Sequence, residues 1–582
     1  MAVPPVIRFD SLDPRRGARS LRFGDFQSVL RADTVDEVRP VLAAVQRAVD
    51  DGLHAAGFVA YEAAPAFDPA LVTRPPDPRL PLAWFALYAR RDEVKPAFGE
   101  AADVELGPWR MDISEDEYRQ RIERIRSLIE AGDTYQVNFT ARLRAEFRGD
   151  DLAFYERLCL AQRSAFCAFL RLDGFSILSA SPELFFHATG SDLELRPMKG
   201  TRPRGRWPDE DRALAAELAA SPKDRAENLM IVDLLRNDAG RVAEFGSVRV
   251  ERMFQPERYE TVHQLTSTVR ARLRPGAGLP EIFGALFPCG SVTGAPKVRT
   301  MEIIAELENA PRGVYCGAIG FASPGESAFS VAIRTLVLDH ATSEVELGVG
   351  SGVTFDSDAS AEYGECLAKA AFARRAPAGF HLLETLLWEP DGGWYLLGRH
   401  LERLTGSAEY FDFPFDREAV IQSLADAADT FTGRPMRARL TLAREGLISV
   451  TSALLEPSPE PVRVAIAREP VDSHDPLLYH KTTSRAVYES RAATRPDCGD
   501  VLLVNERGEI TESTIANLVV RIDGAQWTPP LESGLLPGVL RADLLAHGEI
   551  RERVIRPDDL LRAEEMWLVN SVRRWRRAVL VA

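Results

Sequence analysis

The chain has 582 residues, of which 45% are hydrophobic and 27% are charged, and its formal net charge is -15. This length exceeds what one hydrophobic core organises and the composition is ordinary, so two or more globular domains are predicted and a fibrous or disordered protein is excluded. The acidic excess argues against nucleic-acid and membrane-surface binding, because such surfaces recruit clustered Lys and Arg.

Cysteine usage and hydropathy indicate the cellular compartment of the protein. The six cysteines are scattered without CxxC or metal-ligand spacing, which indicates neither a disulfide framework nor a zinc site and favours a reducing, cytoplasmic environment. The N-terminal residues have no continuous apolar run behind their charges, and no later segment reaches the roughly 18 apolar residues of a membrane span. Neither export nor membrane anchoring is therefore expected.

The first third of the chain alternates predicted strands and helices. Apolar stretches at 57–61 and 82–88 predict strands. From Glu115, apolar residues recur at steps of three and four and predict a helix that ends near Gly132. A strand is expected to follow from Gln136 to Leu143.

This alternation continues to Arg374, where the sequence ARRAPAGF indicates a short junction before a new strand at 381–388. We therefore predict an α/β (α+β) protein with a domain boundary near Ala376. The first domain would cover residues 1–375, with an N-terminal subdomain over about the first 105 residues, and the second would cover 376–582.

Two predicted helices each carry a pair of acids three residues apart. Ser221 suits an N-cap and Pro222 the first helical position, which places Asp224 and Glu227 on one face. A helix over 360–374 would bury Tyr363, Cys366, Leu367 and Ala370 and line up Glu362, Glu365 and Lys369 on its other side. Such carboxylates suit Mg²⁺, although solvated surface pairs are the commoner explanation of this spacing.

Several motifs that follow one another in the chain favour the metal site over solvated surface pairs. They are GDTYQVN (132–138), SPELFF (181–186), RPMKGTRPRG (196–205), VDLLRND (232–238) and CGSVTGAPKVRTMEII (289–304). With them, residues 1–374 resemble the chorismate-utilising enzymes. The resemblance implies a mixed α/β fold with two packed antiparallel sheets.

The same resemblance implies roles for individual residues. It implies Mg²⁺ bound through Glu227 and Glu365 with Glu362 and Asp224 nearby, a catalytic Thr293, and substrate carboxylates held by Tyr315, Arg334, Lys369, Gly350 and Gly352. Chorismate carries two carboxylates and a leaving hydroxyl, so a cation, a guanidinium and glycines that permit close approach fit its chemistry.

Lys199 discriminates within this family. Anthranilate synthases typically have Ala at this position, whereas the resembling aminodeoxychorismate synthases use the lysine as a nucleophile on the chorismate ring. A water-activating base, as in isochorismate-forming relatives, is the alternative role. Gln264 stands where many relatives have a His tied to pyruvate elimination, which favours amination without elimination, although His263 is a possible substitute.

The first domain also implies a partner. The sequence leaves no room for a glutaminase domain, so ammonia is expected from a separate glutamine amidotransferase subunit or from solution.

A second set of motifs lies after residue 378. They are HLERL (400–404), YHKTTSR (479–485), LLVNERGEITESTIANLVV (502–520), TPPLESGLLPGVLR (528–541) and LVNS (568–571). Pyridoxal phosphate needs a lysine, an acid facing its pyridine nitrogen, and Arg or backbone amides on its phosphate. The motifs resemble the class IV aminotransferase-fold proteins, which include lyases and transaminases.

This second resemblance implies Lys481 as the Schiff-base lysine, Glu512 on the pyridine nitrogen, Arg403 on the phosphate, and the Gly538 and Val539 amides at a helix N-terminus. Asn517 and Ser571 are further implied ligands, and Leu540 replaces a hydroxyl residue common in relatives. Because class IV relatives are often dimers, a homodimer through the second domain is also expected.

The fusion of both regions suggests consecutive reactions. Amination of chorismate at C4 would give 4-amino-4-deoxychorismate, and elimination of pyruvate would then give 4-aminobenzoate for folate synthesis. The alternative is an anthranilate- or isochorismate-type synthase fused to an amino-acid transaminase. A non-catalytic scaffold is opposed by the intact Lys199, Glu227, Glu365, Lys481 and Glu512.

Overall fold

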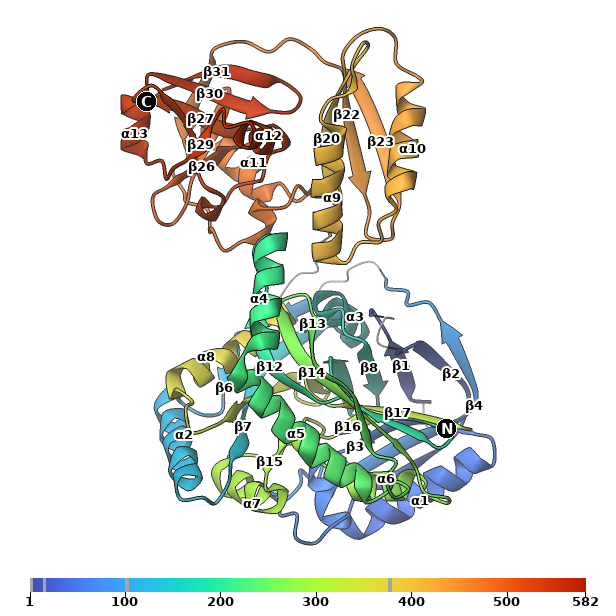
Figure 1. The fold of residues 1–582 in the computed structure, drawn as a ribbon. Helices are drawn as coiled ribbons and strands as arrows, with labels where there is room; N and C mark the ends of the chain where they lie inside the picture. Colours follow the sequence, from blue (N-terminus) through green and yellow to red (C-terminus); the bar gives the residue numbers. More distant parts are fainter. Residues whose placement is uncertain (1–3, 14–16, 100–103, 375–378, 582) are drawn as a thin grey trace. The chain divides into compact units, whose positions relative to one another are not determined.

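The computed structural model describes residues 4–13, 17–99, 104–374 and 379–581. The chain forms two compact units (Figure 1): unit 1 comprises Met1–Pro203 and Ala215–Pro377, and unit 2 comprises Arg204–Leu214 and Ala378–Ala582. The boundary predicted at Ala376 lies outside the described residues, and sequence patterns gave no sign that Arg204–Leu214 belongs to unit 2. In the described part of the chain, no helix has the length and apolarity needed to cross a membrane.

Unit 1 is built on one series of antiparallel strands. Pairing runs from β7 through β19, β18, β9, β8, β1, β2, β4, β3, β16, β17, β10, β11 and β14 to β13. The strands are β1 Val6–Asp10, β2 Ser20–Ala32, β3 His54–Val59, β4 Ala83–Val94, β5 Val104–Leu106, β6 Arg110–Met111, β7 Gln136–Gly149, β8 Phe166–Arg171, β9 Phe175–Ser181, β10 Leu184–Thr189, β11 Asp192–Leu195, β12 Met198–Pro203, β13 Arg249–Arg258, β14 Val262–Arg272, β15 Gly294–Ala295, β16 Ala318–Ser323, β17 Glu326–Val331, β18 Thr335–Asp339 and β19 Glu344–Val353.

Three apolar cores show how these strands are layered. One core joins residues of β1, β8 and β9 to residues of β2, β3, β4 and β16, so two halves of the series pack face to face. The other two cores lie under helices. Helices α1 Val35–Asp50, α5 Pro222–Gly240 and α6 Leu279–Leu286 cover one, and α2 Glu115–Glu130, α3 Asp151–Gln162, α7 Lys297–Leu307 and α8 Ala359–Ala370 cover the other.

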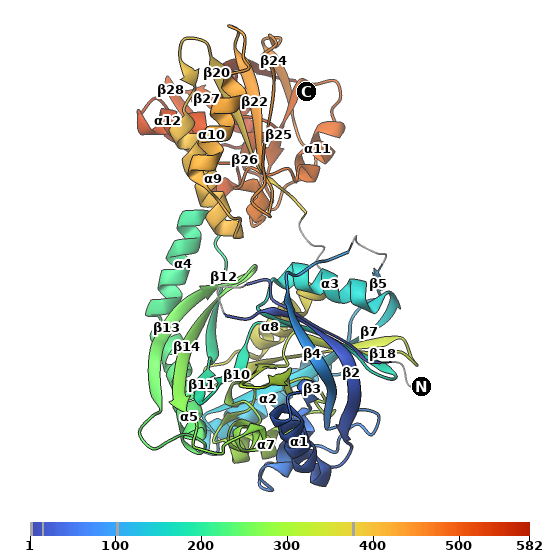
Figure 2. The same ribbon diagram turned by 90° about the vertical axis from the view of Figure 1, so that its right-hand side faces the viewer.

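This arrangement confirms the mixed α/β class. The two predicted sheets are joined where β1 pairs with both β2 and β8. Helix α1 contacts β2, β3 and β4 on the outside of one half (Figure 2).

The predicted helices that frame the first site are present. Helix α5 starts where Ser221 accepts a hydrogen bond from the Asp224 amide at 3.3 Å. Helix α8 starts after Asp358, whose side chain caps the Ala361 amide, and it buries Cys366 and Ala370 as predicted. Leu367 was wrongly predicted to be buried: it is 45% exposed, because the buried stripe of α8 is narrower than its apolar positions suggest.

Unit 2 contains two sheets. A four-stranded antiparallel sheet of β21 Gly393–Trp394, β20 Leu382–Glu389, β22 Met436–Leu442 and β23 Ile448–Leu454 shares a core with α9 Leu397–Phe411 and α10 Arg417–Ala428. An eight-stranded sheet contains β24 Val462–Ile466, β25 Asp500–Val504, β26 Ile510–Ser513, β27 Asn517–Ile522, β28 Ala525–Thr528, β29 Arg551–Glu552, β30 Glu565–Asn570 and β31 Arg574–Leu580. Its helices are α11 Ala486–Ala493, α12 Val539–Ala546 and α13 Pro557–Arg562. Helix α4 Pro208–Ala220 is divided between the two units.

Candidate active sites

A cavity of about 430 Å³ lies in unit 1 between strand ends and two helices. It brings together residues from β7, β12, α5, β19 and α8 that are up to 231 positions apart in the sequence (138 to 369). The predicted residues that line it are Lys199, Asp224, Glu227, Tyr315, Arg334, Gly350, Gly352, Glu362, Glu365 and Lys369. Motifs that lie up to 231 positions apart therefore form one site.

Lys199 lies on β12 at the wall of this cavity. Its Nζ donates to Asn138 Oδ1 at 3.3 Å. Burial lowers the pKa of Lys199, and nearby Lys369 lowers it further, whereas Glu227 acts in the opposite direction. A lysine needs its neutral form to act as a nucleophile, so this environment favours the predicted chemistry.

The carboxylates of α5 and α8 supply oxygen donors at the same cavity. Burial raises the pKa of Glu227, and the charges of Asp224 and Glu362 add to that rise. Glu365 pairs with Lys369 Nζ at 2.5 Å, and Asp224 pairs with Arg202 at 3.2 Å. Like charges held together at a partly buried site are relieved by a cation. Since Mg²⁺ takes one or two carboxylates and keeps several waters, this donor set fits it.

Glycines on β19 allow close approach. A Cβ at Gly352 would lie 2.2 Å from Gln136 Nε2 and 2.4 Å from Lys199 Nζ, and a Cβ at Gly350 would lie 2.5 Å from the Phe139 carbonyl oxygen. No larger residue fits at either place without displacing its neighbours. Both positions therefore require glycine, and the predicted approach of substrate to this backbone stays a prediction.

The predicted substrate-binding side chains surround these glycines. Lys369 Nζ donates to Gly350 O at 2.8 Å, and Arg334 donates to the Lys369 carbonyl. Burial lowers the pKa of Arg334 to about 10, which leaves it a cation at neutral pH. Tyr315 is 8% exposed and lies against Gly348, where a Cβ would touch its ring. A guanidinium and an ammonium group so placed suit a dicarboxylate ligand.

Three cavity or near-cavity groups were missed from the sequence. Glu183 lines the cavity, is 4% exposed, and has a pKa raised to about 7 by burial. Gln136 is fully buried beside Lys199 and neither of its amide atoms has a partner, and the Asn138 amide nitrogen also lacks one. Their motifs, SPELFF and GDTYQVN, were recognised, but burial and missing partners cannot be deduced from letters.

Thr293 and the pair His263 and Gln264 are placed differently. Thr293 is fully buried, its hydroxyl donates to the Cys289 carbonyl at 3.2 Å, and it is not among the cavity-lining residues. Its catalytic role stays a prediction. Gln264 lines the cavity and accepts from Thr201, whereas His263 is buried and does not line it. The structure thus gives no support to His263 as a substitute.

Lys481 in unit 2 lies beside two of its predicted partners. Burial lowers the pKa of Lys481 to about 8, and Arg403 contributes in the same direction. Glu512 on β26 accepts from Tyr488 Oη and the Leu536 amide, each at 3.0 Å, and burial raises its pKa to about 7. A partly buried lysine with a lowered pKa and a buried acid fit the Schiff-base and pyridine ends of pyridoxal phosphate.

The predicted phosphate ligands also meet. Arg403 on α9 is held by both oxygens of Glu384, at 2.9 and 2.6 Å, and donates to the Pro537 carbonyl at 3.1 Å. Gly538 and Val539 follow directly and open α12, so an anion there would meet a guanidinium and free helical amides.

The remaining predicted ligands differ in how closely they are tied to this group. Asn517 Nδ2 donates to Glu512 at 3.2 Å and to the Leu536 carbonyl at 2.9 Å, and a Cβ at Gly538 would lie 1.8 Å from Asn517 Oδ1. Ser571 is buried just after β30. Leu540 is buried as well and offers no hydrogen bond, as expected from its side chain.

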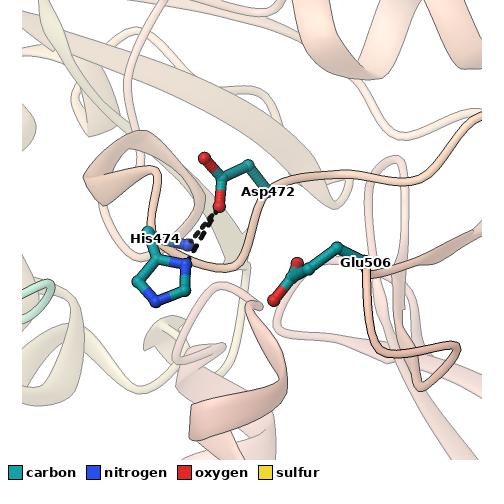
Figure 3. Close-up of side chains that lie close together, drawn as sticks. All are labelled: Asp472, His474 and Glu506. Carbon is teal, nitrogen blue, oxygen red and sulfur yellow. Dashed lines mark hydrogen bonds and ion pairs between the residues drawn. The ribbon is translucent and has the colours of Figure 1, made fainter.

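One further cluster of metal-type ligands is visible in Figure 3. Asp472, His474 and Glu506 are exposed and form the only group of three such side chains within 4.8 Å of one another in the described residues. Glu506 already accepts from Ser473 at 2.7 Å and from Arg507 at 2.8 Å, and His474 pairs with Asp472 at 3.1 Å. These contacts account for the cluster, which lies outside both predicted sites.

Comparison with known proteins identifies both regions. Residues 15–375 match the model of the chorismate binding enzymes. The chain belongs to this family. Residues 381–581 match the model of the class IV amino-transferases, so the chorismate-binding domain is followed by a class IV domain, as predicted.

Individual relatives cover the first region. The aminodeoxychorismate synthase component 1 of Klebsiella aerogenes is 44% identical over 294 residues, 50% of this chain and 63% of that protein. The anthranilate synthase component 1 of Cereibacter sphaeroides is 42% identical over 289 residues, 49% of this chain and 57% of that protein. The crystal structure of anthranilate synthase component I from Streptococcus pneumoniae covers 64% of this chain and 93% of its own, with 26% identity and a TM-score of 0.54. The chain spans less than two thirds of the length of these curated relatives. Their names denote two different synthases, so the names alone do not give the product.

Proposed function

We propose that the protein makes 4-aminobenzoate in two steps, with unit 1 converting chorismate and ammonia to 4-amino-4-deoxychorismate and unit 2 releasing pyruvate from that product. The observation that carries the proposal is the presence of two partly buried lysines, Lys199 and Lys481, each with lowered pKa and each beside carboxylates. Identity to relatives does not choose between C4 and C2 amination. The position of Lys199 at the cavity supports C4 amination, because a lysine there can act as the nucleophile that this route requires.

In the first step, Arg334 and Lys369 would hold the carboxylates of chorismate over the Gly350 to Gly352 backbone. Lys199 then forms a bond to the ring as the C4 hydroxyl departs. Glu183, whose pKa is about 7, carries a proton at neutral pH in part of the population and would give it to the departing hydroxyl, which leaves as water.

Ammonia would complete the exchange by forming the new C4–N bond as the bond to Lys199 breaks. Both amide atoms of Gln136 and the Asn138 amide nitrogen lack partners beside Lys199. Gln136 can therefore donate to and accept from polar groups there, and Asn138 can donate to them. Bound through Glu227 and Glu365, Mg²⁺ would neutralise the carboxylates that face the substrate anion.

In the second step, pyridoxal phosphate would supply an electron sink for the carbon that bears the amino group. Arg403 and the amides of Gly538 and Val539 would hold its phosphate, and Glu512 its pyridine nitrogen. Lys481, as a free amine, would take the proton from the amino-bearing carbon, and the bond from the neighbouring ring carbon to the enolpyruvyl oxygen would break. The proton would pass to the departing enolpyruvyl group, which leaves as pyruvate. Formation of the aromatic ring drives pyruvate release.

The partner and compartment belong to the same proposal. The component 1 names of relatives support ammonia delivery by a separate glutamine amidotransferase. All six cysteines are free, which supports a cytoplasmic, reducing environment. A homodimer through unit 2 is expected, and a monomeric mass by light scattering would reject it.

The test is mass analysis of products from purified protein given chorismate, Mg²⁺ and ammonium, comparing wild type with Lys481→Ala. Wild type should yield 4-aminobenzoate and pyruvate, and the variant should stop at 4-amino-4-deoxychorismate. Anthranilate from the wild type, or no aminated product from either protein, would overturn the assignment of unit 1. Pyruvate and 4-aminobenzoate from Lys481→Ala at the wild-type rate would overturn that of unit 2.

A further inference from the structure

An eleven-residue segment, Arg204–Leu214, belongs to unit 2 although its sequence neighbours belong to unit 1. It follows β12, which carries Lys199, and precedes α5, which carries Asp224 and Glu227. We call it the 204–214 segment. All contacts described below lie inside unit 2.

The 204–214 segment is held in shape by a buried ion pair. Arg204 contacts both oxygens of Asp211, at 2.7 and 2.9 Å, and both side chains are under 10% exposed. The same carboxylate accepts from the Gly205 amide at 2.9 Å. A Cβ at Gly205 would lie 2.2 Å from the Asp211 amide nitrogen, so the turn requires glycine. The segment is thus folded by its own residues.

This folded segment binds the end of α9 and the residue pair before Lys481. Arg204 stacks on the ring of Tyr410 at 4.2 Å and donates to its carbonyl at 2.9 Å, while Tyr410 Oη donates to the Gly205 carbonyl at 2.7 Å. Trp207 packs on Tyr479, with ring centroids 5.1 Å apart. Arg206 stacks on Trp207 and donates to Tyr479 Oη at 3.3 Å. The 204–214 segment therefore contacts both Tyr479 and Tyr410.

His480 links these contacts to the lysine. Its ring lies 4.3 Å from that of Tyr410, and its Nδ1 is 2.9 Å from Ser407 Oγ. Burial lowers the pKa of His480 to about 3, so the imidazole stays neutral and adds no charge beside Lys481. On the other side, the Leu383 amide donates to the Lys481 carbonyl at 2.9 Å. The lysine backbone is thus fixed by β20 on one side and, through Tyr479 and His480, by the 204–214 segment on the other.

We propose that the 204–214 segment is a positioning element of the Lys481 site, supplied by a stretch of chain that interrupts the chorismate-binding domain. It keeps Tyr479 and His480 packed, and so keeps Lys481 in place and shielded from water. This inference rests on the proposed role of Lys481. The stretch 199–227 then serves both reactions, with Lys199 at one end, Glu227 at the other, and the support of Lys481 between them.

The test uses the full chain loaded with pyridoxal phosphate and compares Trp207→Ala and Trp207→Phe with Arg212→Ala. Arg212 lies on α4 within the same segment, is exposed, and pairs with exposed Asp209, which makes it the matched control. Two quantities are measured: the midpoint of the pH titration of the cofactor's visible absorption, and kcat and KM for pyruvate release from supplied 4-amino-4-deoxychorismate.

Loss of the Trp207 ring should lower kcat about tenfold with KM changed less than about twofold, since small misplacements of a reacting group are costly. The titration midpoint should move to higher pH, because water that reaches the lysine nitrogen stabilises its protonated, positively charged form. Trp207→Phe should restore most of both, and Arg212→Ala should match the wild type. A Trp207→Ala enzyme with reduced thermal stability but a wild-type midpoint and kcat would overturn the proposal.

A second variant covers the case in which Trp207→Ala does not fold. Arg206→Gln keeps the tryptophan and removes the bond to Tyr479, and it should shift the midpoint in the same direction by a smaller amount. An unshifted midpoint in a folded Arg206→Gln enzyme would overturn the proposal. An absent visible band in wild type would instead reject Lys481 as the cofactor lysine, which is a failure of the proposed function and not of the segment's contacts.

Discussion

The two units each partly bury a lysine and lower its pKa, but the neighbouring charge with the largest effect has opposite sign at the two sites. Around Lys199, burial is opposed by the carboxylates of Glu227 and Glu183. Around Lys481, burial is reinforced by the cation of Arg403. The first lysine is therefore set against groups that a metal would neutralise, whereas the second depends on fixed positive charges. A motif identifies each lysine, but residues from other elements determine its protonation state.

The contrast between the two sites would fail if one lysine served both reactions. Lys199→Ala should lower the amination rate by about 10³-fold or more, because it removes the nucleophile and leaves only binding. Pyruvate release from supplied 4-amino-4-deoxychorismate should be unchanged. The measurement is product formation from each substrate separately, and equal losses in both assays would show that the two sites are not independent.

Gly352→Ala should have the next largest effect. Its Cβ would lie 2.4 Å from Lys199 Nζ and 2.2 Å from Gln136 Nε2, so the lysine must shift. Amination should fall by about 10²-fold, the cost of displacing a reacting group by an ångström. Gly364→Ala on α8 is the control, since a Cβ there meets nothing within 4 Å. Comparable kinetics for the two alanine variants would contradict the close approach at Gly352.

Sequence patterns predicted the elements of unit 1 better than their environments. The helix from Ser221 and the acids on α5 and α8 followed from caps and spacing, because those are local signals. Burial of Leu367 was wrong, since helical period does not tell how wide the covering surface is. Gln136 and Glu183 were quoted in motifs without a role, because their burial depends on strands far away in sequence.

Unit 2 shows the same limit in another form. The lysine, the acid, the arginine and the helix N-terminus were all named from motifs, and the structure places Arg403 beside Pro537 and Glu512 beside Leu536. The 204–214 segment was not foreseen, because a continuous sequence gives no sign that eleven residues belong to a different unit. Glu384, which holds Arg403, was also missed, although Arg403 and His400 hold its pKa at about 2 against the effect of burial.

The pH dependence of cofactor uptake sharpens the description of Lys481. Only the neutral amine reacts with the aldehyde of pyridoxal phosphate, and the pKa of Lys481 is about 8 in the cofactor-free protein. The rate at which the stripped enzyme recovers its visible absorption should therefore rise about tenfold per pH unit below 8 and level off above it. A rate that keeps rising past pH 9, about one unit beyond the expected pKa, would indicate a lysine that burial does not perturb.

The smallest expected effect isolates the contribution of fixed cations. Arg485, the residue that caps the start of α11, lowers the pKa of Lys481 and also that of Glu512. Its guanidinium donates to the Thr514 carbonyl. Arg485→Gln removes one cation, so the uptake profile should move to higher pH by less than about one unit. Arg491→Gln, on the same helix but not among the groups acting on Lys481, should leave the profile in place. An unshifted profile, or a shift to lower pH, would show that the charge of Arg485 does not control the pKa of Lys481, and the contrast between the two sites would lose this support.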